Sequence, residues 1–377
     1  MGKINKQSGA VSLFAVIFAT LLLTILTISF IKIMINEQQR ATENDLSQSA
    51  YDAALAGVED AKRAIRRCQQ GDATACNALA AADDCKVVAR AGVAGNTASN
   101  ETVIQSNSTS GQAYDQAYSC VNIDMNTEDF LYDAQEAETE LIPLRATGSV
   151  SRLVLEWYSQ KDVGEGLQAT DPPAVVSGAY LPPKADWGAT VPPVLRVQVI
   201  TPGEQFNLGD LDDSDASQTV FLRPTGVSGG PNGFLVSLAA YSRATDGTQH
   251  DNSVTPIPSC TRTFNYDGYA CKAILELPSA MSAADSRNSF VSIKPIYKGA
   301  AVRLQMQAAD GSVVMLNGVQ PAVDSTGRAS NLYRRVDARL KIGDDFPYPE
   351  NALSVENSLC KDFSVTNSGV VNGVCTP

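Results

Sequence analysis

The sequence predicts an α+β fold in which one long N-terminal helix precedes a disulfide-containing, antiparallel, β-rich domain of sandwich type. Three observations support this prediction. A continuous apolar stretch, AVSLFAVIFATLLLTILTISFIKIMI, extends from Ala10 to Ile35. The segment after it repeats apolar residues at intervals of three and four, which is helical spacing. Later segments alternate apolar and polar residues, as half-buried strands do.

The apolar stretch is long enough to cross a membrane. Its 26 residues would form about 39 Å of helix, which exceeds the ~30 Å hydrocarbon core of a bilayer. One charge, Lys32, lies near its far end and can reach the membrane interface. A cleaved secretory signal has a shorter apolar core, of about 7–15 residues. Lys3 and Lys6 precede the stretch, so the positive-inside rule predicts a cytoplasmic N-terminus and an extracytoplasmic remainder.

The helix is predicted to continue beyond the membrane without a break. No proline or turn cluster follows Asn36. One apolar face is formed by Tyr51, Ala54, Val58, Ala61 and Ile65. We therefore expect a single helix over residues 10–67, with its transmembrane part at about 10–35. A simple membrane anchor with a separate juxtamembrane helix is the alternative interpretation.

This arrangement resembles the N-terminus of type IV pilins and pseudopilins. A short basic leader ends at Gly9, an apolar run follows, and an amphipathic helix continues from it. The stretch SQSAYDAALAGVEDAKRAI, Ser47 to Ile65, is similar to the Ala-rich pattern of PilX-type minor pilins. The resemblance implies that a prepilin peptidase removes residues 1–9 by cutting between Gly9 and Ala10. It also implies that the helix is held in the membrane and later packs against other pilins.

The resemblance has one departure. Pilins usually carry Glu at the fifth mature position, where its carboxylate pairs with the terminal amine of a neighbouring subunit. Counted from Ala10, that position is Phe14, so this filament-register position lacks Glu. A buried carboxylate is costly unless it is paired. Family members without this Glu are typically minor subunits, which implies an initiating or tip position.

Eight cysteines lie beyond the apolar stretch, where the predicted topology favours disulfides. Cys260 and Cys271 flank a hairpin-sized loop with an Asp-Gly turn signal, and we expect them to pair. Cys360 and Cys375 enclose a loop that resembles the C-terminal disulfide loop of many pilins. The other four allow three connectivities, which the sequence leaves open: Cys68, Cys76, Cys85 and Cys120. Residues 68–120 are predicted to be a disulfide-rich loop region.

Residues 121–377 are predicted to form the β-rich extracytoplasmic domain, as one unit or two. The clearest strands are Leu195 to Ile200, Val302 to Ala308 and Val336 to Ile342. The proline-rich segment from Asp171 to Val194 cannot be regular structure. It is either a long ordered excursion or a linker, and its aromatic residues Tyr180 and Trp187 favour packing of this segment against a sheet.

The net charge argues against nucleic-acid binding, and the sequence contains no motif that indicates catalysis. The net charge is −12 at pH 7, whereas binding of a phosphate backbone needs a surplus of Lys and Arg. The single histidine, His250, lies in a polar loop without a nucleophile motif around it. An acidic turn is a weak calcium candidate, because the EF-type positions for Gly and Glu are not matched: Asp210, Asp212, Asp213 and Asp215. We expect no cofactor.

Three classes of function follow from the sequence. The first is a structural, non-enzymatic minor pilin or pseudopilin-like subunit, with an initiation, tip or adhesion role at the cell surface. The second is a membrane-anchored surface adhesin that does not polymerise. The third is a membrane-tethered enzyme, for which the sequence offers no constellation of catalytic residues. The sequence does not identify a ligand of the β-rich domain.

Overall fold

The computed structural model describes residues 8–81, 85–94, 97–98, 101–105, 115–136, 138–173, 182–203, 216–226, 234–241 and 258–341. It has the predicted α+β fold, a long apolar N-terminal helix followed by mainly antiparallel sheets with disulfides. The chain divides into two compact units: Met1–Asp124 with Ala322–Leu340, and Met125–Pro321 with Lys341–Pro377. This division differs from the expected boundary at residue 121, because a C-terminal hairpin joins the sheet of the first unit.

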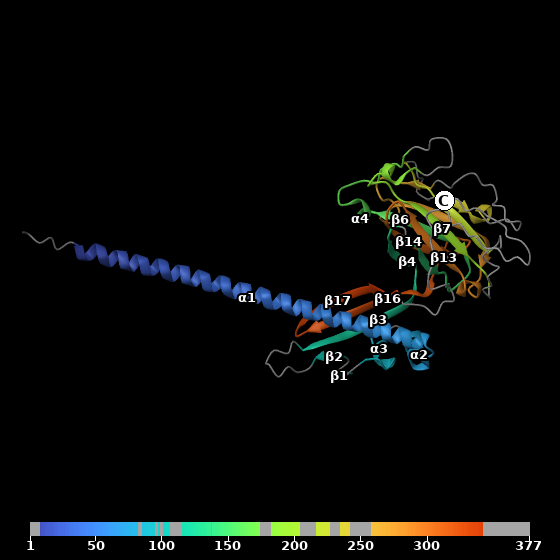
Figure 1. The fold of residues 1–377 in the computed structure, drawn as a ribbon. Helices are drawn as coiled ribbons and strands as arrows, with labels where there is room; N and C mark the ends of the chain where they lie inside the picture. Colours follow the sequence, from blue (N-terminus) through green and yellow to red (C-terminus); the bar gives the residue numbers. More distant parts are fainter. Residues whose placement is uncertain are drawn as a thin grey trace, which may run out of the picture. The chain divides into compact units, whose positions relative to one another are not determined.

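The first unit combines three helices with one five-stranded sheet (Figure 1). Its helices are α1 (Ser8–Gln69), α2 (Ala73–Ala80) and α3 (Val87–Arg90). Its strands follow the order β1 (Thr97–Ala98), β2 (Glu101–Gln105), β3 (Gln116–Thr127), β16 (Leu316–Ala329) and β17 (Leu332–Arg339). The long strands β3 and β16 each continue into the second unit.

The region expected to be a disulfide-rich loop, residues 68–120, contains regular elements. The Asp72 side chain caps α2 by accepting hydrogen bonds from the backbone N–H groups of Thr74 and Ala75. The α3 helix and β2 also fall in this region. Local capping and pairing of β2 with β3 provide the order that composition did not indicate.

The second unit is a sandwich of two sheets. The larger sheet follows the order β15 (Val313–Val314), β14 (Ala300–Gln307), β6 (Val150–Ser159), β12 (Tyr269–Met281), β11 (Ser259–Cys260) and β9 (Thr225–Gly226). Two further strands pair with it, β4 (Asp129–Ala134) with β14 and β10 (Phe234–Ser237) with β12. The smaller sheet contains β5 (Glu140–Pro143), β13 (Phe290–Ile296), β7 (Val194–Ile200) and β8 (Ser217–Leu222). Short helices connect the strands: α4 (Gln160–Val163), η1 (Lys184–Asp186), η3 (Leu238–Tyr241) and η4 (Asp285–Arg287).

One hydrophobic core lies between these two sheets. Leu153, Leu155 and Trp157 of β6 contribute from the larger sheet, and Val197 and Val291 from the smaller one. Alternation along each strand places these side chains on the inner face. Nearly all pairings are antiparallel, with two short parallel exceptions, β10 with β12 and β11 with β9.

The predicted strands are present with shifted ends. Leu195 to Ile200 lies within β7, and Val302 to Ala308 overlaps β14. The strand expected at Val336 to Ile342 begins earlier, at Leu332, because it forms a tight hairpin in which Ala329 pairs with Leu332. Ser330 at the hairpin tip has a positive φ of 54°.

The described part of the proline-rich segment packs on the second unit. Trp187 is buried with Val191 and Val194, and it stacks on Tyr297 with ring centroids 4.3 Å apart. Prolines lack the N–H donor of a sheet ladder, so side chains hold this segment instead. Tyr180 lies outside the described residues.

Candidate functional site

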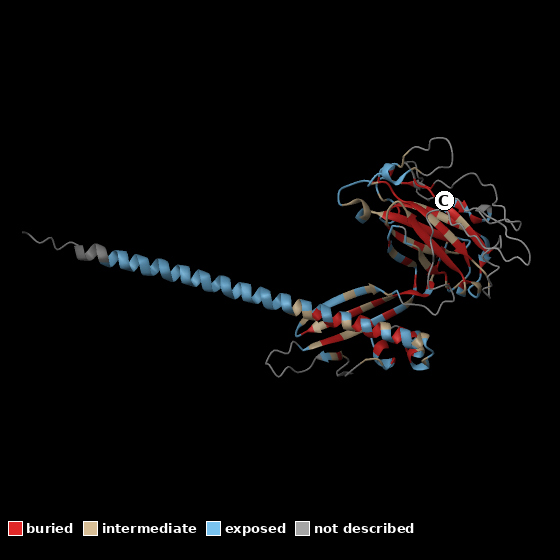
Figure 2. Cartoon of the chain, viewed as in Figure 1, coloured by how far each residue is buried: buried red, intermediate tan, exposed pale blue. Residues whose placement is uncertain are grey.

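The N-terminal half of α1 is an exposed apolar helix. Every side chain from Leu13 to Ile35 is exposed, as Figure 2 shows along the length of the helix. Large exposed hydrophobic patches mark surfaces that meet a membrane or another protein. By length and composition, α1 is the one helix among the described residues that could cross a membrane.

The four hydroxyl side chains between Leu13 and Ile35 donate hydrogen bonds to carbonyls of the same helix. The hydroxyls of Thr20 and Thr24 donate to the carbonyls three residues earlier, and those of Thr27 and Ser29 donate four residues earlier. Lys32 is the single charge between Leu13 and Ile35. The segment therefore presents an almost uncharged surface that is compatible with hydrocarbon.

Phe14 lies on this surface, with 68 % of its side chain exposed. The segment from Leu13 to Ile35 contains no carboxylate. Gly9 and Ala10 lie in the first turns of α1, which begins at Ser8. Their side-chain environment and the leader residues 1–7 lie outside the described part of the chain.

The C-terminal half of α1 packs on the sheet of the first unit through very small residues. Ala50, Ala53, Ala54 and Ala61 are buried against the sheet. A Cβ atom on Gly327 of β16 would overlap the backbone of Ala50 and Ala54, so helix and strand backbones lie in direct contact there. This close approach requires glycine on the strand and alanine on the helix.

The same contact corrects the predicted helix face. Tyr51 was expected on the buried face, but it is 43 % exposed, while its neighbours Ala50 and Ala53 are buried. The close contact between the helix and strand backbones at Gly327 leaves no room for the Tyr51 ring. The buried face of α1 is therefore shifted toward the small residues Ala50 and Ala53. A second close approach, between Gly57 and Ser325, lies further along the helix.

One carboxylate is buried where α1 meets the sheet. Asp60 accepts a hydrogen bond from the Tyr118 hydroxyl at 2.7 Å and pairs with Arg63 at 2.8 Å. Burial, together with the hydrogen bond to Asp60, raises the pKa of Tyr118. Tyr118 therefore stays a hydrogen-bond donor and fixes the orientation of α1 on β3.

Three disulfides are present among the described residues. Cys260 pairs with Cys271, as expected, and the open connectivity is Cys68 with Cys76 and Cys85 with Cys120. Cys68–Cys76 joins the end of α1 to α2, and Cys85–Cys120 joins the start of α3 to β3. The expected pair Cys360 and Cys375 lies outside the described residues.

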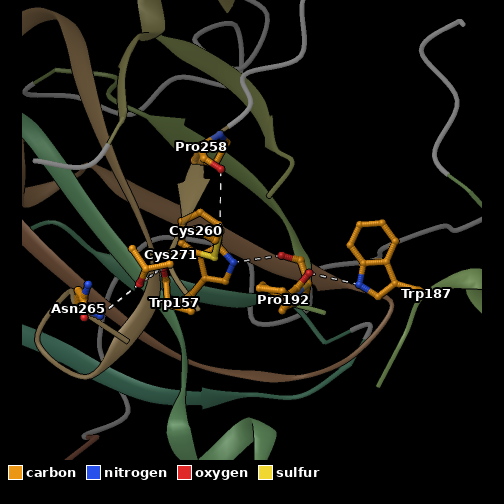
Figure 3. The surroundings of a disulfide bond; sticks show 10 residues. Trp157, Trp187, Pro192, Pro258, Cys260, Asn265 and Cys271 are labelled. Carbon is orange, nitrogen blue, oxygen red and sulfur yellow. Dashed lines mark hydrogen bonds between the residues drawn. A yellow bond between two sulfur atoms is a disulfide. The ribbon is translucent and has the colours of Figure 1, made fainter. Parts of the chain in front are cut away.

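The Cys260–Cys271 bridge lies beside a tryptophan in the sandwich core (Figure 3). The indole N–H of Trp157 donates to the Pro193 carbonyl at 3.1 Å, and that of Trp187 donates to the Pro192 carbonyl at 3.2 Å. The Trp157 indole therefore links the proline-rich segment to β6, the Trp187 indole closes a contact within that segment, and the bridge joins β11 to β12. These contacts are structural.

The described regions contain no cluster of three or more His, Cys, Asp or Glu side chains that could hold a metal ion. The calcium candidates Asp210, Asp212, Asp213 and Asp215, like His250, lie outside the described residues. The main buried charges in the second unit are paired: Arg303 contacts Glu156 at 3.1 Å and Asp129 at 2.9 Å.

Sequence reasoning missed the strand residues that receive α1. The signal was present in VDSTGRA, Val323 to Ala329, where Ser325 and Gly327 alternate as small residues on one strand face. Comparison of the chain with protein-family models, curated proteins and solved structures gives no match.

Proposed function

We propose that the chain is a structural, non-enzymatic subunit of a type IV pilus or a related filament, of the minor-pilin or pseudopilin kind. In this proposal α1 is anchored in the membrane before assembly and packs against other pilins afterwards. The two units are displayed outside the membrane, with the N-terminus in the cytoplasm. Phe14 in place of Glu supports an initiating or tip position.

The observation that carries the proposal is that one continuous helix has an exposed apolar half and a half that packs on a sheet. From Leu13 to Ile35 the helix is exposed and apolar, whereas from Ala50 onward it is seated on an antiparallel sheet. An ordinary anchor needs no rigid connection to the folded unit. A filament subunit does, because the exposed helix must hold the displayed unit in a fixed position.

Leader processing tests the proposal. The full chain is expressed with and without a prepilin peptidase, and the mature N-terminus is determined by intact mass. We expect loss of residues 1–9 only with the peptidase, and retention of the product in the membrane fraction. Gly9→Trp should abolish the cleavage, because the small residue before the cut is required.

The matched control is Ser8→Thr, which changes the neighbouring residue without adding bulk at the cut. Normal maturation of Gly9→Trp, or a leader retained in the presence of the peptidase, would contradict the pilin proposal. The second outcome would favour the membrane-anchored adhesin.

A further inference from the structure

We infer that the outer edge of β17, the edge that faces away from β16, pairs with the same edge of a second copy. The two strands run antiparallel about a two-fold axis at Val336. The contact is isologous, so each copy offers the same residues to the other. It goes beyond the proposed function, because it follows from the sheet of the first unit and from the way α1 packs on that sheet.

β17 is the last strand of the five-stranded sheet. Among the described residues it pairs with β16 alone. Ala329 and Leu332 pair across a two-residue loop, so their backbone groups face each other, and pairs alternate along an antiparallel ladder. The N–H and C=O groups of every second residue therefore point away from β16: Tyr333, Arg335, Asp337 and Arg339. An edge strand offers such outward groups to another strand.

These four outward residues also present their side chains to solvent, since all four are exposed. They lie on the sheet face away from α1, because the neighbouring Arg334 points toward the helix and donates to the Ser47 hydroxyl at 2.8 Å. The charges alternate in sign along the edge, with Arg335 and Arg339 on either side of Asp337. Charges of one sign would repel a second copy, whereas alternating charges can be self-complementary.

The order of these residues selects one register. In an antiparallel pair centred on Val336, Arg335 of each copy lies opposite Asp337 of the other. Tyr333 then lies opposite Arg339. Opposite charges, and a cation beside an aromatic ring, both stabilise cross-strand pairs. A centre at residue 334 or 335 places Arg opposite Arg, a centre at residue 337 places Asp opposite Asp, and a centre at residue 338 pairs residues 337–339 alone.

The carboxylates of the hairpin favour a second arginine from outside the chain. Asp337 lies directly opposite Asp324, and like charges in that position are destabilising. Arg335 binds Asp324, and among the described residues Asp337 takes part in no salt bridge. The Arg335 side chain remains 66 % exposed, and such a surface pair is weak. In the proposed contact each of the two carboxylates has an arginine beside it.

α1 carries two exposed apolar side chains above this edge. Ser47, which accepts the hydrogen bond from Arg334, marks the side of the helix that lies over β17. Tyr51 and Leu55 follow Ser47 at intervals of four, so they continue along that side. They are 43 % and 37 % exposed, and they are the only large apolar side chains exposed between Ala50 and Gln69. A strand added to the edge would bring a second α1 onto the same face, where it would cover them.

The direction of the second helix follows from the contacts of the first. These contacts pass from Gly327 to Ser325 as α1 proceeds, so α1 runs along β17 and against β16 (Figure 1). Ser325 pairs with Val336 and lies against Gly57, so the two-fold axis passes close to Leu55. Antiparallel strands carry antiparallel helices. The contact therefore joins copies whose apolar segments point in opposite directions, and it differs from packing between parallel helices in one membrane.

Cysteine cross-linking of the full chain in detergent tests the register. Val336→Cys places one thiol of each copy at the axis, where the Cα atoms are about 4.5 Å apart, within the range of a disulfide. Arg334→Cys is the matched control on the same face of the same strand, because residue 334 lies opposite residue 338 and not opposite itself. After oxidation we expect self-linkage of Val336→Cys to exceed that of Arg334→Cys by about tenfold or more. A mixture of tagged Arg334→Cys and Ala338→Cys copies should link to each other about tenfold more than to themselves.

Exchange of the charges tests the cross-strand pairs. Arg335→Asp and Asp337→Arg each place like charges opposite one another, so each variant alone should self-associate about tenfold or more weakly than the unsubstituted chain. In a mixture of the two variants every such pair again joins an acid to a base, and association should return to within about threefold. Glu165→Arg is the matched control, since it reverses a charge at an exposed residue of the second unit. Sedimentation velocity in density-matched detergent measures all four samples.

Circular dichroism and thermal unfolding of each variant separate a lost contact from a lost fold. Absence of the 336–336 link, or unchanged self-association of both charge variants, would overturn the inference. Equal self-linkage of Val336→Cys and Arg334→Cys would indicate parallel strands and would also overturn it. So would a link from the introduced thiol to another cysteine of the same chain, because the chain would then cover its own edge. Leader cleavage does not enter these measurements, so they stand whether or not the proposed function holds.

Discussion

Lys298, in the second unit, is hydrogen-bonded to the proline-rich segment. Its amine donates to the Tyr158 hydroxyl at 2.6 Å and to the Ala189 carbonyl, and it lies 4.3 Å from the centre of the Tyr158 ring. Tyr158 and Tyr297 both have positive φ values, of 68° and 82°, which tertiary contacts must maintain. Burial lowers the pKa of Lys298 to about 8 and raises the pKa of Tyr158.

Because burial lowers the pKa of Lys298, we predict that the free energy of unfolding rises with pH. The folded chain releases the Lys298 proton near pH 8, whereas the unfolded chain keeps it to about 10.4. Between these values the unfolded state binds more protons, so the free energy of unfolding increases as pH rises. Lys298→Met should flatten that increase between pH 8 and 10. Tyrosines with raised pKa act in the opposite direction above pH 10.

Denaturant titrations at pH 7, 8, 9 and 10 measure the effect. Lys272→Met is a control that removes a lysine of β12 that is paired with Glu156. An unchanged slope in Lys298→Met between pH 8 and 10 would contradict the assignment of the proton release to Lys298.

At the scale of elements, the contact between α1 and its sheet was only half predictable. The helical spacing of apolar residues predicted an amphipathic helix, and α1 extends from Ser8 to Gln69. The spacing of apolar residues predicted that Tyr51 lies on the buried face, which is wrong. Periodicity describes an average over many positions, so it does not show where the helix backbone touches a strand backbone. The partner strand β16 lies far away in the sequence, and nothing local indicates which strand a helix will meet.

Gly327→Ala tests this contact. The added Cβ meets backbone atoms of Ala50 and Ala54, which cannot turn away as a side-chain end could. We expect a loss of about 1–3 kcal/mol in the free energy of unfolding, from overpacking. Chemical denaturation of the full chain in detergent, followed by circular dichroism, measures it. Gly148→Ala is the matched control, because its Cβ would make an ordinary contact of 3.7 Å with Val314. Equal stability of the two variants would show that α1 is not seated on Gly327.

At the scale of the whole molecule, patterns that repeat along the chain were predictable and pairings between distant segments were not. The alternation of apolar and polar residues predicted the core strands β7 and β14, and the even number of cysteines predicted disulfides. The sequence could not show that β16 and β17 leave the second unit to complete the sheet under α1. It also could not choose between Cys68–Cys76 and its alternatives, since connectivity depends on how the chain is folded.

The exposure of α1 predicts that its N-terminal part is dispensable for folding. Side chains from Leu13 to Asp45 are exposed, so their removal loses no tertiary contact within the chain. A chain that starts at Asn44 keeps a helix-capping residue type at its end and the hydrogen bond from Arg334 to Ser47. We expect it to be soluble without detergent, with a Tm within about 2 °C of the full chain measured in the same buffer with detergent.

A chain that starts at Gly57 is the control, because it also lacks the seated residues Ala50, Ala53 and Ala54. Its first unit should unfold more than about 5 °C lower, since several kcal/mol of burial are removed. Thermal unfolding and size-exclusion chromatography distinguish the two chains. Aggregation of the longer chain, or an equal fall in Tm for both, would mean that the first half of α1 supports the fold itself. Its exposed apolar surface would then not be free to contact a membrane or a second helix.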